Sequence, residues 1–212
     1  MSMTGHIDYQ IEKYQFTALG EDPRLTRQWA EVITECQQSR AGSEERLRIA
    51  LLNVDYVTSF ELPFRLLLIR APQLVAGMRE TLAISQKSAV FNDKRFGCVY
   101  SLKTGLGDIP DAFHYRLSTR IRRVAPGGSD AAPFQQIAKE TKAPRERLKM
   151  ALEAGLSVTA LDGLFWFGIQ RIAADVLRLR KSGMGIMTAE TEVSDSLTGT
   201  TRLVPVYRLT RR

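Results

Sequence analysis

The stretch FGIQRIAADVLRLRKSGMGIMTAETEV, residues 167–193, joins a basic helix-forming segment to a strand-forming one. Its apolar residues recur at a helical period, at Ile169, Ile172, Ala173, Val176 and Leu179. Its cations lie outside that stripe, at Arg171, Arg178, Arg180 and Lys181. This spacing predicts a helix over 169–183 with one face in a core and the other basic, ended by Gly183.

The charge of the chain is divided unevenly along its length. Residues 1–115 hold 13 Lys and Arg against 14 Asp and Glu, whereas residues 116–212 hold 17 against 9. The first part therefore has a net charge of −1 and the second a net charge of +8. Concentrated positive charge attracts polyanions and favours phosphate contacts, so the C-terminal half is where we expect a nucleic-acid partner.

Several classes of protein find no support in the sequence. No apolar run reaches the roughly 18 to 20 residues of a membrane span, and the N-terminus lacks a secretory pattern. We therefore expect a cytoplasmic protein with no membrane partner. Cys36 and Cys98 are too few for a disulfide framework or a metal-ligand pattern, which predicts two reduced, packed thiols.

A reaction centre is equally hard to find. His6 and His114 are the only histidines, and the glycines of KTGLGDIP, residues 103–110, lack the spacing of a phosphate-binding loop. We expect no catalytic residues, no metal and no cofactor. Acids scattered through the first half, Asp55 and Glu61 among them, keep a two-metal nuclease open as an alternative.

The segment VAPGGSDAAPF, residues 124–134, is rich in Pro and Gly and predicts a connection between two domains. We expect a mixed α+β domain over 1–125, used for dimerisation or partner binding, and a second domain over 131–212. In the first domain the predicted features are a strand through Ile7–Ile11, a helix capped by Asp22, a helix capped by Ser43, a helix over 72–84 and a strand over 95–105.

The second domain is easier to divide into elements. Pro144 begins a helix that stops at Gly155, and Ser157 or Thr159 caps the next one, which ends at a tight turn at Gly168. The basic helix follows, and then two strand-like runs, GIMTAETEV and TRLVPVYRL. The pattern predicts three helices and a β-hairpin, within an α+β chain.

Residues 143–212 resemble the winged helix-turn-helix modules common in phage and prophage proteins. The resemblance rests on Arg171-Ile172-Ala173-Ala174, Val176, Leu179-Arg180, Gly183, Ile186 and Tyr207-Arg208-Leu209. The sequence departs from the pattern at Met184, where an aromatic residue is common, and at Trp166. The resemblance implies that the hairpin is a wing and that the basic helix is the recognition helix.

In a helix-turn-helix, the recognition helix enters the major groove of DNA. We expect Gln170 and Arg171 to contact base edges, Ala174 to permit close approach, and Arg178 and Lys181 to contact phosphates. Arg202, on the predicted wing, is the last candidate contact, although acids including Asp195 weaken a wing that binds DNA. The alternative is a solvated helix in which Asp175 pairs with Arg171 and Arg178.

Three functions follow as expectations. The first is a sequence-specific DNA-binding regulator of a phage or mobile element. It would act on double-stranded DNA, and a homodimer is one possible form of it. The second is a phage-type interaction protein that inhibits a host nucleic-acid machine. The third is a DNA-processing or replication accessory factor.

Overall fold

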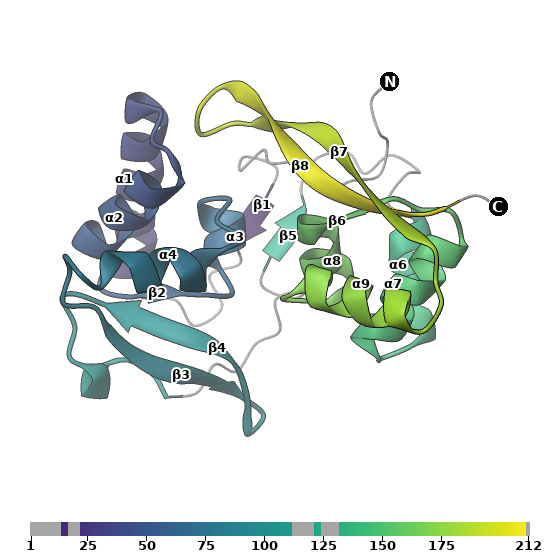
Figure 1. Ribbon diagram of the computed structural model, residues 1–212. Coiled ribbons are helices and arrows are strands. Elements are labelled where there is room, and N and C mark those ends of the chain that lie inside the picture. Colours follow the sequence, from purple (N-terminus) through teal and green to yellow (C-terminus); the bar gives the residue numbers. More distant parts are fainter. Residues whose placement is uncertain (1–13, 17–21, 112–120, 124–131, 211–212) are drawn as a thin grey trace. The chain divides into compact units, whose positions relative to one another are not determined.

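The computed structural model describes residues 14–16, 22–111, 121–123 and 132–210 (Figure 1). The chain is mixed α+β, as the sequence predicts, and it divides into two compact units. The N-terminal unit contains the described residues up to 123 together with the segment Asp195–Thr200. The C-terminal unit contains residues 132–194 and 201–210. The described residues up to 123 and those from 132 on fall in different units, on either side of the connection that the sequence predicts, and a further division falls within the last hairpin.

The N-terminal unit begins with two helices in contact, α1 (Pro23–Ser39) and α2 (Ser43–Asn53). Asp22 caps α1 by accepting a hydrogen bond from the backbone N–H of Arg24 at 2.8 Å, which confirms the predicted cap. The predicted cap of α2 is wrong by one residue. Gly42 is the N-cap and Ser43 the first helical residue, and the acidic pair that follows complements the helix dipole instead.

After these helices come β2 (Val57–Thr58), α3 (Leu62–Arg65), α4 (Ala71–Met78) and the 3₁₀ turn η2 (Leu106–Asp108). Strands β3 (Ser85–Phe91) and β4 (Lys94–Ser101) form an antiparallel hairpin, with the sheet order β2-β4-β3. The helix predicted over 72–84 stops early because turns bonded to the Met78 carbonyl lead directly into β3. The predicted strand over 95–105 is confirmed as far as Ser101.

A second, two-stranded sheet pairs β1 (Tyr14–Phe16) with β5 (Ile121–Arg123). The strand predicted through Ile7–Ile11 lies outside the described residues.

The turn between β3 and β4 consists of Asn92 and Asp93, which both adopt positive φ, of 47° and 59°. This conformation is that of the two-residue turns that match the twist of a hairpin.

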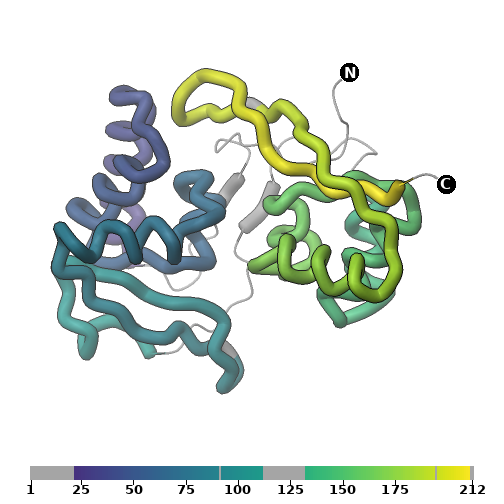
Figure 2. Tube along the Cα trace, in the orientation of Figure 1, coloured from purple at the N-terminus to yellow at the C-terminus, as the bar shows by residue number. Residues whose placement is uncertain are grey.

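The C-terminal unit is built from α6 (Ala132–Glu140), α7 (Pro144–Glu153), α8 (Ala160–Phe167) and α9 (Ile172–Lys181). Its sheet has the order β6-β8-β7, formed by β6 (Val158–Thr159), β7 (Ile186–Asp195) and β8 (Thr200–Leu209). Figure 2 traces the long hairpin of β7 and β8. The three predicted helices and the hairpin are therefore present.

One helix of this unit was not predicted. Phe134 and Ile137 of α6 are buried in the same core as Leu148, Phe167 and Val176. The apolar core therefore begins before residue 143, where the sequence resemblance starts.

Candidate nucleic-acid interface

Helix α8 is fixed at its start by a buried capping box. The Thr159 backbone N–H donates to Asp162 Oδ2 at 2.9 Å, and the Asp162 backbone N–H donates to Thr159 Oγ1 at 3.2 Å. Both side chains are fully buried, where no water can reach them. Each therefore supplies a hydrogen-bond partner to a backbone N–H that would otherwise have none. Of the two caps the sequence allowed, Thr159 is the correct one.

The connection from α8 to α9 fixes the start of the basic helix. Gly168 ends α8 in the left-handed conformation, with φ of 73°, and the Ile169 N–H donates back to the Gly163 carbonyl at 2.9 Å. Ile169 is buried after this turn. The turn uses residues 168–171, and α9 therefore begins at Ile172 rather than at residue 169 as predicted.

Helix α9 has one buried and one exposed face. Ile172, Val176 and Leu179 pack into the core of the C-terminal unit. The predicted inner position of Ala173 is wrong, because Ala173 is exposed. Because the helix starts at Ile172, its apolar stripe is narrower than predicted. Residues at every third or fourth position are enough to cover the core.

The candidate DNA contacts fall in three places. Gln170 and Arg171 are exposed but precede the helix, where Arg171 is the N-cap residue. Ala174, Arg178 and Lys181 lie on the exposed face of α9. Arg202 lies on β8 and is half-buried. The structure therefore brings five of the six candidates to α9 and the turn that precedes it, and leaves Arg202 on a different element.

An ion-pair cluster at the exposed face of α9 includes a residue that the sequence did not indicate. Asp175 lies 3.0 Å from Arg145 Nε and 3.3 Å from Arg178 Nη1. Arg145 belongs to the first turn of α7, 30 positions earlier. The predicted pairing of Asp175 with Arg178 is present. In the described part of the chain Asp175 forms no ion pair with Arg171, whose side chain is exposed to solvent.

The remaining arginine of the helix anchors it to the hairpin. Arg180 Nε donates to the Ile186 carbonyl at 2.9 Å, and Nη2 donates to Thr188 Oγ1 at 2.8 Å. These bonds connect the last turn of α9 to β7. Arg180 therefore has a structural role, whereas Lys181 beside it is exposed to solvent.

The tip of the hairpin, which the resemblance implies is a wing, contains buried residues. Asp195 and Leu197 are both buried. Asp195 pairs with Arg46 of α2 at 3.0 Å, and the pair lies within the N-terminal unit. Neither side chain is therefore available to a nucleic acid in this conformation.

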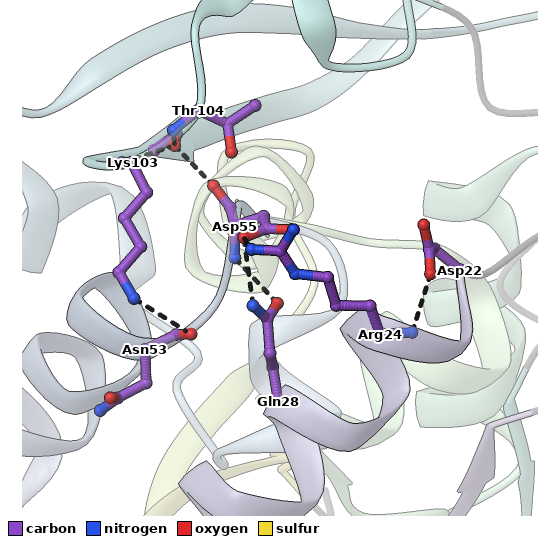
Figure 3. Close-up of polar contacts among 8 residues, drawn as sticks. Asp22, Arg24, Gln28, Asn53, Asp55, Lys103 and Thr104 are labelled. Atoms are coloured by element: carbon purple, nitrogen blue, oxygen red, sulfur yellow. Dashed lines mark hydrogen bonds and ion pairs between the residues drawn. The ribbon is translucent and has the colours of Figure 1, made fainter.

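A second polar cluster lies in the N-terminal unit around Asp55 (Figure 3). Gln28 and Arg24 of α1 both reach Asp55 Oδ1, at 3.1 and 3.3 Å, and the Asp55 N–H donates to Gln28 Oε1. The Ser101 hydroxyl donates to the Asp55 carbonyl at 2.6 Å. Each contact supplies a hydrogen-bond or ion-pair partner to a polar group of Asp55. Together the contacts connect α1 to the end of β4. We interpret this cluster as structural.

Other kinds of site are not apparent in residues 14–16, 22–111, 121–123 and 132–210. No three His, Cys, Asp or Glu side chains in these ranges are grouped so that they could hold a metal ion. Within the same ranges, no helix combines the length and apolar character needed to cross a membrane. No family model, curated protein or solved structure matches the chain.

Proposed function

We propose that the C-terminal unit is a winged helix-turn-helix and that the protein binds duplex DNA in a sequence-specific manner through α9. The observation that supports this most is the face of α9 opposite the core, which presents Ala174, Arg178 and Lys181 to solvent with Arg171 at its start. The order of α7, α8, α9 and the hairpin is the order that the sequence resemblance implies.

The dimensions and charge of α9 suit a DNA groove. Its 10 residues span about 15 Å, and the major groove is wide enough to admit a helix. Arg171 lies at the amino end, where the helix dipole is positive and no side chain among the described residues caps the helix. An arginine there can bond bidentately to guanine. Arg178 and Lys181 lie further along, where phosphate contacts are expected.

The role that fits best is a transcriptional regulator of a phage or mobile element, with the N-terminal unit serving dimerisation or partner binding. One observation favours a second candidate, an interaction protein. Leu177 is 51% exposed on the outer surface of α9, between Ala174 and Lys181. A leucine there suits a thymine methyl group, but it suits an apolar protein pocket equally well.

The first test is a fluorescence-anisotropy titration of the full chain with a labelled random duplex, repeated at several salt concentrations. We expect the affinity to fall by orders of magnitude over a roughly fourfold rise in salt, because several phosphates are neutralised. Lys181→Ala should lower the slope of log affinity against log salt by about one. The control is Arg27→Ala, which removes an exposed cation of α1. Equal slopes for the two variants, or no binding at low salt, would count against the proposal and favour a protein partner.

A further inference from the structure

The tip of the β7–β8 hairpin contains two buried residues separated by one position. Asp195 is 3% exposed and Leu197 is 1% exposed. Both belong to the segment Asp195–Thr200, which is part of the N-terminal unit. A turn between two long strands usually lies in solvent, so an acid and a leucine both removed from water require a specific environment.

Arg46 of α2 provides that environment for the acid. Its guanidinium is 2% exposed, and Nη2 donates to the two carboxylate oxygens of Asp195 at 3.1 and 3.0 Å. Nε donates to the Ala41 carbonyl at 2.7 Å and Nη1 to the Leu66 carbonyl at 3.3 Å. The carbonyls of residues 41 and 66 therefore orient the guanidinium of Arg46, and its remaining nitrogen, Nη2, faces the tip of the hairpin.

The tip is shaped by its own hydrogen bonds. Asp195 Oδ1 accepts a bond from the Leu197 N–H at 3.0 Å, and the Asp195 carbonyl accepts one from the Gly199 N–H at 2.9 Å. Gly199 has a φ of 68°, in the left-handed region that glycine adopts without strain. These local bonds hold the carboxylate and Leu197 in one compact turn.

We infer that the N-terminal unit contains a recognition site, centred on Arg46, for a turn of the form Asp-x-Leu, and that the protein's own hairpin tip occupies it. A guanidinium buried without its carboxylate is strongly destabilising, so residues 22–111 need Asp195 to reach their full stability. The tip acts as a structural element of the N-terminal unit and is withheld from nucleic acid. This inference does not depend on DNA binding by α9.

The test compares two full-length variants that each remove one acid from the hairpin. Asp195→Asn removes the buried carboxylate, and Glu192→Gln removes an exposed one on β7. Amide hydrogen exchange is measured over α2 and residues 62–68, together with affinity for a random duplex. We expect Asp195→Asn to speed exchange in α2 by about a hundredfold, as loss of a buried ion-pair partner implies. Glu192→Gln should leave this exchange unchanged, and the two variants should have similar duplex affinity.

A double variant, Arg46→Met with Asp195→Leu, separates loss of the specific pairing from general damage. It removes both charges, so exchange protection in α2 should recover relative to Asp195→Asn. Unchanged exchange in Asp195→Asn would overturn the inference. A fall in duplex affinity confined to Asp195→Asn, with α2 still protected, would also overturn it and would make the tip a DNA contact.

Discussion

Arg145, in the first turn of α7, and Asp175, in α9, form an ion pair of 3.0 Å across two helices. This pair accounts for an acid on an otherwise basic surface. Asp175 holds Arg145 and Arg178 beside each other. Its negative charge reduces the net charge of the three side chains from +2 to +1. The side chain of Asp175 is 17% exposed, whereas those of Arg145 and Arg178 are 51% and 61% exposed. The arginines therefore remain open to an anionic partner.

Asp175→Ala is expected to strengthen binding to random duplex severalfold, because two arginines lose their neutralising partner. Its cost in stability should stay below about 1 kcal/mol, since exposed ion pairs contribute little. Anisotropy titrations and chemical denaturation measure the two effects. Glu153→Ala, which removes an exposed acid at the end of α7, is the control. If both variants raise the affinity equally, Asp175 has no special place in the interface.

Ile172→Asp should unfold the C-terminal unit. It places an uncompensated charge in the core, at a cost of several kcal/mol, comparable to the stability of a small domain. The neighbouring Ala173→Asp changes an exposed residue in the first turn of α9 and should cost less than about 1 kcal/mol. Thermal unfolding followed by circular dichroism compares them. A similar loss in both variants would show that the two faces of α9 are assigned incorrectly.

Gly97→Ala should destabilise the N-terminal unit by about 1 to 3 kcal/mol. A Cβ atom there would lie 2.8 Å from Phe60 Cδ1 and 2.8 Å from Ser59 Oγ. The Phe60 ring is buried and in contact with that of Phe96, so it has little room to move. Gly77→Ala, in α4, meets nothing within 4 Å and should instead stabilise by about 0.5 to 1 kcal/mol. Chemical denaturation measures both, and a neutral Gly97→Ala would contradict the packing.

The two thiols should differ in reactivity. Burial raises the pKa of Cys36 from its ordinary value of 9.0 to about 11, whereas Cys98 is only half-buried. At pH 8 we expect one thiol per folded chain to react rapidly with a disulfide reagent, and two after denaturation. Replacing Cys98 by Ser should abolish the rapid reaction.

The raised pKa of Cys36 also has a consequence for stability. The neutral thiol contributes stability that is fully present below about pH 9 and is lost as the pH rises through about 11. Denaturation midpoints measured between these values should therefore fall more steeply in the parent than in Cys36→Ala. Parallel pH profiles for the two proteins would contradict the burial of this thiol.

Local patterns predicted many of the elements correctly. Asp22 with Pro23, Thr159 as one of the two caps that the sequence allows, and Gly168 mark helix ends through contacts between neighbours in sequence, and such contacts are visible in a sequence. The start of α9 was misplaced because residues 169–171 continue the helical pattern. In the structure these residues belong to the turn, which the left-handed Gly168 and the bond from the Ile169 N–H to the Gly163 carbonyl define.

Long-range pairings could not be predicted. Arg46 and Asp195 are 149 positions apart, and no local pattern in the sequence pairs them. Leu197, an apolar residue in an otherwise polar tip, was the single local hint that the turn is covered. Arg145 gave no hint at all, because its partner Asp175 lies on another helix.

The proposed recognition of DNA sequence by α9 depends above all on Arg171, and Arg171→Ala tests it. A duplex selected from random DNA by the full-length parent is compared with an unselected duplex, and folding is checked by circular dichroism. We expect the variant to lose about 1 to 3 kcal/mol on the selected duplex and much less on the unselected one. Lys181→Ala should weaken both by similar factors. If folded Arg171→Ala protein binds the selected duplex as tightly as the parent does, sequence recognition by this helix is contradicted and the protein-partner alternative moves ahead.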